Sequence, residues 1–340
     1  MSVKKTAAIA VATVASGLAL AAPAFAYDEI RTDLVPGDVV RDVGISLVVP
    51  QPGDFTWAAA ELQEDGAQTL GALTQEDGTV ILAEVGADAT AVPTSAADIA
   101  GGSAPLDTDG LLDNATPDAA PIAPAAAAGA CDDGAYKLQT WTFSDGSRKH
   151  PKWKSTFNWH FRSGSTPNNV GQAAARDAIV RAVTNITGSH NSCGLADEVN
   201  ATSAYQGSTT TGTNLSSDGS TCLASDSKSV VAFGSLSSGT LAAACTWGTY
   251  DTGTYAKITK SDVRINKSVY GWYGTEPSGC STRWAIEGVM THEFGHSFGL
   301  GHVGEADHGN LTMSTHINGP CQNSEASLGL GDVRGLRVLY

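Results

Sequence analysis

The C-terminal two thirds of this 340-residue chain predict an α+β fold. Three observations carry this prediction. Ser155 to Arg162 alternates apolar and polar residues, an amphipathic helical pattern follows after Asn169, and several β-type segments then precede a long helical segment that contains His292 and His296. About 210 residues from Cys131 onward are enough to bury one core without a second domain.

The first strand and the first helix have clear patterns. Strand Ser155–Arg162 is expected to bury one face, which holds Phe157, Trp159 and Phe161. The helix is expected to be capped by Asn169, with Gln172 three residues later, and to end at Gly188. Its apolar residues fall at helical spacing, namely Ile179, Val183 and Ile186.

The later elements follow from composition. Segments rich in β-type residues, separated by Gly- and Ser-rich turns, predict strands at Glu198–Gln206, Lys228–Phe233, Thr240–Trp247 and Asp262–Asn266. Thr282–Phe298 is predicted to be a long helix, and it carries the histidine motif described below.

The chain begins with the pattern of an export signal. Lys4 and Lys5 precede an apolar run from Thr6 to Ala22, and Ala24-Phe25-Ala26 has the small-x-small form of a cleavage site. Residues 1–26 are therefore expected to be a signal peptide, so that the mature, secreted chain begins at Tyr27. No other stretch has about twenty consecutive apolar residues, so no membrane anchor is expected.

Charge divides the mature chain into two parts. Residues 27–130 contain 18 acidic and 2 basic residues, whereas residues 131–340 contain 17 acidic and 16 basic residues. Neither part offers a basic excess to phosphates, so a nucleic-acid-binding function is not expected.

The composition of the acidic part predicts a folded unit followed by a linker. Short β-branched runs between Pro, Gly and Asp predict a small β-rich unit from about Asp38 to Val85, whereas Gly86–Ala130 has the composition of a protease-accessible linker. Two interpretations stay open for residues 27–130. They form either a pro-segment that masks the active site until export, or a solvated spacer ahead of the domain at residues 131–340.

All six cysteines follow the linker, at positions 131, 193, 222, 245, 280 and 321. An even number in an exported chain predicts three disulfide bonds, and the sequence does not choose among the fifteen possible pairings. Cys131 is expected to be a structural half-cystine rather than a thiol that blocks a metal.

The strongest motif is the stretch His292-Glu293-Phe294-Gly295-His296-Ser297-Phe298-Gly299-Leu300-Gly301-His302. Residues four apart lie on one face of a helix, so His292 and His296 can bind the same ion. A catalytic zinc takes three protein ligands, and His302 is the expected third. It is out of register with the first two, so the helix must stop, and Gly299 is expected to end it.

Glu293 is the expected catalytic base, because it follows the first ligand and can take a proton from the attacking water. By chance, the eleven-residue pattern should occur about once in fifty thousand chains of this composition. His308 and His316 are further candidates for substrate contact, although a solvated role is the simpler interpretation.

The motif resembles the zinc signature of the metzincin metallopeptidases, in particular the matrixins. Their second mark is a methionine in a tight turn below the metal, and Met313 stands eleven residues after His302. The resemblance implies a twisted, mostly parallel sheet with two long helices, a zinc cleft and a small C-terminal subdomain. Leu330–Tyr340 is similar to the last helix of matrixins. The tyrosine that some metzincins place two residues after the methionine is replaced by Thr315.

The resemblance also implies a role for Thr240–Thr246. In that layout this strand is the sheet edge above the zinc, and a substrate peptide pairs with its backbone. The alternative is an edge that is already covered, by a loop or by a disulfide through Cys245.

The sequence therefore predicts a secreted, zinc-dependent endopeptidase with one catalytic Zn²⁺, metal ligands His292, His296 and His302, and Glu293 as general base. Its partners would be protein or peptide substrates and its own pro-segment as an inhibitor, with no nucleic acid or membrane partner and a monomeric state. A structural Ca²⁺ has no support in the sequence. The alternatives are a zinc-bearing binding module and a cell-wall-directed hydrolase, neither with general proteolytic activity.

Overall fold

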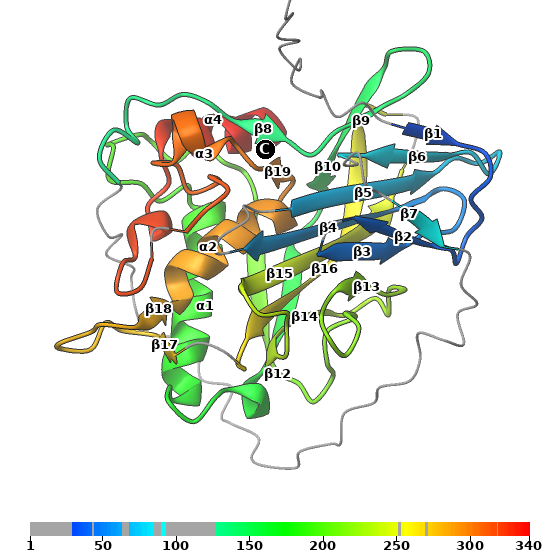
Figure 1. Cartoon of the computed structure of the whole chain (residues 1–340). Coiled ribbons are helices and arrows are strands. Elements are labelled where there is room, and N and C mark those ends of the chain that lie inside the picture. The colour runs from blue at the N-terminus through cyan, green and yellow to red at the C-terminus, as the bar shows by residue number, and fades with distance from the viewer. Residues whose placement is uncertain are drawn as a thin grey trace, which may run out of the picture.

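The computed structural model describes residues 29–42, 44–62, 68–84, 90–92, 127–250, 253–268, 271–317 and 319–340. The expected signal peptide and most of the expected linker lie outside these residues. Of the described residues, 36% lie in strands and 19% in helices. The prediction of an α+β fold with a mostly parallel sheet and two long helices is therefore wrong. A large mixed sheet dominates the molecule (Figure 1).

The main sheet has 11 strands, of which nine follow the order β1-β6-β5-β4-β15-β16-β14-β11-β12. Its parallel part comes from the C-terminal two thirds of the chain and contains β10 (Arg148–Trp153), β11 (Phe157–Arg162), β12 (Ser203–Ser208), β14 (Ser229–Gly234) and β16 (Tyr255–Asn266). Strand β15 (Thr240–Thr249) runs antiparallel to β16, and β9 (Trp141–Thr142) pairs with β10.

The rest of the sheet comes from the acidic segment. Strands β1 (Glu29–Arg31), β4 (Asp54–Leu62), β5 (Gln68–Thr74) and β6 (Val80–Ala83) are antiparallel, and β4 pairs with β15. A second sheet joins β2 (Val39–Asp42), β3 (Ile45–Val48) and β7 (Thr90–Val92) to β13 (Thr221–Cys222). Strands β2 to β6 lie within the range predicted to be a β-rich unit, Asp38–Val85. The role of residues 27–130, pro-segment or spacer, stays a prediction.

The fold-class prediction failed mainly because these antiparallel strands join the sheet of the downstream domain. Strand β4 contains three consecutive alanines, Ala58 to Ala60, which have low strand propensity. Pairing with β15 on one side and β5 on the other decides their conformation. Such long-range pairing leaves no local signal in the sequence.

Helix α1 (Gln172–Thr187) is confirmed and ends at Gly188, but its cap residue is Gly171 rather than Asn169. The Asn169 amide instead donates a hydrogen bond to the carbonyl oxygen of Trp272. Among the described residues, no helix is long and apolar enough to cross a membrane.

Helix α2 (Ile286–Ser297) carries the histidine motif and is shorter than predicted. The residues before it, Arg283–Ala285, form strand β18, which pairs in parallel with β17 (Gly271–Tyr273). Helix α4 (Leu330–Leu339) agrees with the predicted last helix. The remaining short elements are β8 (Lys137–Leu138), β19 (Leu300–Gly301), α3 (Glu305–His308) and two 3-10 turns at Ser163–Ser165 and Ser324–Ala326.

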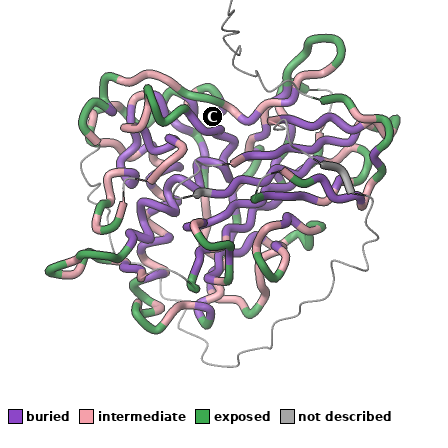
Figure 2. Tube along the Cα trace, in the orientation of Figure 1, coloured by how far each residue is buried: buried purple, intermediate pink, exposed green. Residues whose placement is uncertain are grey.

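Helices α1 and α2 pack together on one face of the main sheet. In Figure 2 the tube is coloured as buried along α2 and along much of the sheet. The predicted inward-facing residues Phe157, Trp159 and Phe161 are all buried there. Phe294 and Phe298 of the motif lie against Phe157, with ring centroids 6.0 and 5.6 Å away. One side of α2 is thus anchored in the core, which leaves its opposite side for His292 and His296.

Three disulfide bonds are present, Cys131–Cys193, Cys222–Cys245 and Cys280–Cys321. The prediction of three bonds is confirmed, and the structure supplies the pairing that the sequence left open. The bonds are compatible with an extracellular protein. Cys131 is a half-cystine, as expected, and therefore offers no thiol to a metal.

We predict that peptide mapping of the unreduced protein will recover these three pairs and no free thiol. Reduction should lower the melting temperature, because each bond restricts the unfolded chain and typically contributes about 2–4 kcal/mol. Mass spectrometry of the digested, unreduced protein checks the pairing. A peptide that joins Cys222 to any partner other than Cys245 would contradict the arrangement of β13 and β15.

Candidate metal centre

Helix α2 places His292 and His296 one turn apart on the side that faces away from the aromatic core. Both are buried, with 0% and 1% of their surface exposed. The Nδ1 atom of His292 donates to the carbonyl oxygen of Thr312 at 2.7 Å, and that of His296 donates to the carbonyl oxygen of Leu300 at 2.9 Å. These bonds fix both ring orientations and direct both Nε2 atoms to one point.

The chain turns back directly after α2, as the spacing predicted. Gly299 has φ +94, and a Cβ atom there would lie 2.3 Å from the carbonyl oxygen of Pro151. Both constraints require glycine. Strand β19 then pairs with β8, where Gly301 lies opposite Lys137, and this pairing delivers His302 to the first two histidines.

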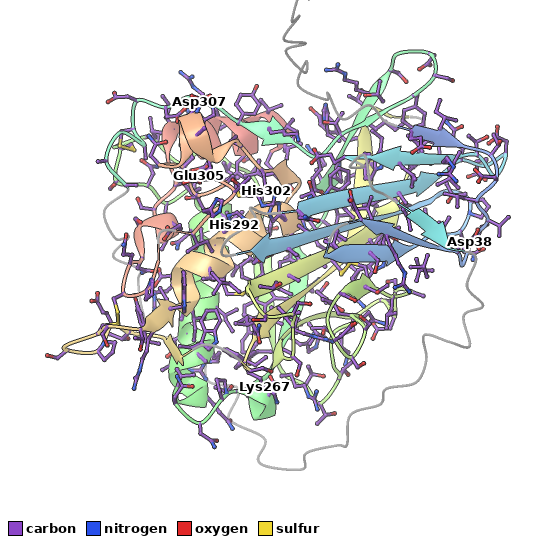
Figure 3. All side chains as sticks on the ribbon, viewed as in Figure 1. Asp38, Lys267, His292, His302, Glu305 and Asp307 are labelled. Carbon is purple, nitrogen blue, oxygen red and sulfur yellow. A yellow bond between two sulfur atoms is a disulfide. The ribbon has the colours of Figure 1, made fainter. Side chains whose placement is uncertain are left out.

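The three Nε2 atoms form a tight triangle. They are 3.1 Å apart between His292 and His302, 3.1 Å between His292 and His296, and 2.8 Å between His296 and His302. Figure 3 shows His292 and His302 close together, from α2 and from the segment after β19. The sequence prediction that these three residues meet is confirmed. They form a buried group that could bind a metal ion.

The ring tautomers explain why this group fits a cation. In a neutral imidazole whose Nδ1 donates to a carbonyl oxygen, Nε2 carries the lone pair. When His292 and His296 are both neutral, their Nε2 atoms turn lone pairs toward each other, 3.1 Å apart. Burial lowers the pKa of His296 and of His302 well below the usual value, and the neighbouring imidazoles lower both further. Neutral rings with converging lone pairs are the state that a metal ion requires.

A turn containing Met313 lies directly against α2. Leu311 to Ser314 form the turn, closed by a hydrogen bond from the Ser314 amide to the Leu311 carbonyl oxygen at 3.1 Å. Met313 is buried, and a Cβ atom on Gly295 would lie 2.2 Å from its sulfur atom. Gly295, between the two helical histidines, thus makes room for the methionine that the sequence singled out.

Asp332 holds this turn in place, and sequence reasoning missed it. Its carboxylate is buried and accepts hydrogen bonds from the backbone amides of Thr312 at 2.9 Å, Met313 at 3.2 Å and Gly329 at 2.9 Å. The Thr312 carbonyl oxygen in turn accepts from His292, so Asp332 supports a histidine through one peptide unit. An acidic residue in the first turn of a predicted helix was the available signal.

Glu293 is fully buried on α2 beside His292. Among the described residues, the group that could hold a metal contains the three histidines and not Glu293.

The other histidine candidates lie apart from the metal group. His308 pairs with Asp133 at 3.0 Å, and His316 lies 3.7 Å from Glu305. Both are about one third exposed, on the segments before and after the Met313 turn.

Strand β15 is not a free edge. The pairing expected for a substrate is made by the chain's own strand β4, over Thr240 to Thr249 of β15. The expectation of an open edge at Thr240–Thr246 is therefore wrong in this state of the chain. The covered-edge alternative is confirmed, although a strand of the acidic segment covers the edge and Cys245 adds a disulfide.

Comparison with known proteins finds no matching family model and no matching curated protein.

We predict that His292→Ala, His296→Ala and His302→Ala will each lower bound zinc, because each removes one of three converging lone pairs. His308→Ala and His316→Ala should keep full zinc content. Elemental analysis of the purified variants, with circular dichroism as a check on folding, measures this. Full zinc content in folded His302→Ala would show that the third ligand is misassigned.

We also predict that Asp332→Asn will lower the unfolding free energy by about 1–3 kcal/mol, since an amide cannot accept all three backbone hydrogen bonds. Zinc affinity should fall as well, because the Thr312 carbonyl oxygen would no longer hold His292 firmly. Denaturant unfolding and zinc titration are the measurements. Asp132→Asn, on the exposed surface, is the matched control, and equal behaviour of the two variants would contradict the role of Asp332.

Proposed function

We propose that this protein is a secreted, zinc-dependent endopeptidase. The observation that carries the proposal is the convergence of three buried imidazole Nε2 atoms within 3.1 Å of one another, with a buried glutamate next to the first. A three-histidine site is typical of catalytic rather than structural zinc, because structural sites usually have four protein ligands. The resemblance of residues 292–302 and Met313 to the metzincin signature points to the same chemistry.

When bound, zinc acts as a Lewis acid and lowers the pKa of a coordinated water to about 7. The protein supplies the remaining functions. His292, His296 and His302 hold the ion, and their Nδ1 contacts keep the rings oriented. Glu293 would take a proton from the attacking water and return it to the leaving amine.

Glu293 follows the first ligand in the chain and has 0% of its surface exposed, so its carboxylate lies in the interior beside His292. A zinc site that serves only structure or binding would not need a glutamate at this position.

Export through the pattern at residues 1–26 is part of the proposal. The three disulfide bonds support it, since such bonds persist in oxidising compartments. Proteins or peptides are the proposed substrates, because the metal centre adjoins a strand edge that already binds an extended chain segment.

The test is Glu293→Gln in the activated protein. The variant should keep its zinc and its melting temperature, while casein hydrolysis falls by several orders of magnitude, because the amide cannot accept the proton. Glu198→Gln, on the surface, should keep normal activity. Chelation of the wild-type metal should abolish hydrolysis, and added zinc should restore it.

Retained hydrolysis in purified, zinc-loaded Glu293→Gln would contradict the proposed mechanism. Absence of peptide hydrolysis in every form of the wild-type protein would instead favour a zinc-bearing binding module.

A further inference from the structure

We infer that residues 29–92 are an intramolecular inhibitor, in which strand β4 occupies the edge of β15 that an extended peptide would otherwise join. The inference rests on the proposed peptidase function and adds to it the regulation of the same site. Strand β4 occupies the edge. Cleavage of the chain between residues 93 and 126, followed by separation of β4, frees it.

The contact between β4 and β15 is the one that an extended peptide makes. Their antiparallel register runs from Asp54 opposite Thr249 to Leu62 opposite Thr240, with one irregularity near Thr240. Backbone groups provide the pairing, so the edge can accept chains of many sequences. While β4 is in place, the outer edge of β15 has no backbone groups left for a substrate.

Side chains add a specific fit to this backbone pairing. The ring of Phe55 lies over Gly248 of β15, where a Cβ atom would approach it to 2.5 Å. Phe55 and Trp57 of β4 also pack on Trp141 of the downstream domain, with ring centroids 4.8 and 5.1 Å apart. The acidic segment is therefore seated on the domain rather than loosely tethered to it.

The covered edge adjoins the metal centre. Helix α2, which carries His292 and His296, packs directly on β15. In Figure 1 the arrowhead of β4 points toward α2, and β5 begins at the same end.

A chain of polar contacts links the same end of the hairpin to the third ligand. Thr69 of β5 donates to Glu84, and Glu84 pairs with Lys137 at 2.6 Å. Lys137 lies opposite Gly301 in the β8–β19 pair, one residue before His302. The acidic segment thus contacts both β15 and the strand that positions His302.

The segment is built so that it can separate. It contains no cysteine, so none of the three disulfides ties it to the domain. The segment supplies most of one apolar cluster, including Leu34, Val40, Leu47, Leu70 and Leu82, and the downstream domain supplies the rest, including Leu236 and Trp247. A cavity of about 430 Å³ lies between this unit and β15, lined by Val49, Phe55 and Trp247 among others.

A second contact opposes separation. Strand β3 pairs with β13, and Ser46 forms a hydrogen bond with Thr221 at 2.6 Å. One cut in the connecting chain should therefore leave the segment bound. After the cut, the segment and the domain are separate chains. The fraction of domain that has lost its segment therefore rises as the protein is diluted.

The experiment uses the secreted chain with the recognition sequence of a specific processing protease inserted between residues 93 and 126. Peptidase activity is measured for the uncut and the cut protein over a wide range of dilution, and gel filtration reports whether the segment remains bound. Hydrogen–deuterium exchange of the Thr240–Thr249 amides reports the state of the β15 edge independently of catalysis.

We expect the uncut protein to be at least about tenfold less active at every concentration, because a tethered strand has a high effective concentration. The specific activity of the cut protein should rise on dilution, in step with loss of the segment and faster exchange in β15. Ala59→Pro, which removes a backbone donor in the middle of β4, should move the rise to higher protein concentration. Ile30→Pro makes the same change in β1, which pairs with β6 and not with β15, and should leave the transition where it is.

Equal activity of cut protein with the segment bound and with the segment lost would overturn the inference and make residues 29–92 part of the scaffold. So would identical dilution curves for Ala59→Pro and Ile30→Pro. If β15 exchange accelerates on dilution as expected while no form hydrolyses peptides, strand release stands and the proposed peptidase function fails.

Discussion

Three buried imidazoles, held with their Nε2 atoms within 3.1 Å of one another, impose the main constraint on this structure. Converging lone pairs repel unless a cation lies between them, so every ring has to be restrained from outside. Carbonyl oxygens of Thr312 and Leu300 restrain two of the rings. The buried carboxylate of Asp332 fixes the Thr312 peptide in turn. The centre is therefore preorganised by a second layer of contacts that is as buried as the ligands.

The glycines of the motif show how closely this layer approaches the helix. Gly295 leaves space for the sulfur of Met313, and Gly299 passes within contact distance of the Pro151 backbone. Larger side chains at either place would push apart the helix, the turn or the neighbouring strand. The glycines of the motif are thus required by packing around the histidine group, and its histidines are the candidate ligands.

The sheet edge beside the centre links the two parts of the chain. Strand β15 lies between β16 of the downstream domain and β4 of the acidic segment. The same backbone groups can serve a covering strand or a substrate, but not both at once. The fold class of the whole chain therefore does not decide the proposed chemistry, which depends on the histidine group. The antiparallel strands that make the chain mostly β are also those that cover the edge.

The sequence by itself determined the metal group, because the ligands lie within eleven residues and helical geometry plus one glycine stop dictates how they meet. It also determined α1 and the buried face of β11, where local periodicity is strong, whereas α4 was expected only from the resemblance to matrixins. Only the tertiary structure decided the fold class, the disulfide pairing and the role of Asp332. Each of these depends on contacts between residues far apart in the chain, such as Ala59 with Ala244 and Cys131 with Cys193. Local propensity carries no information about such contacts, and the alanine run of β4 would favour another conformation without its two neighbours.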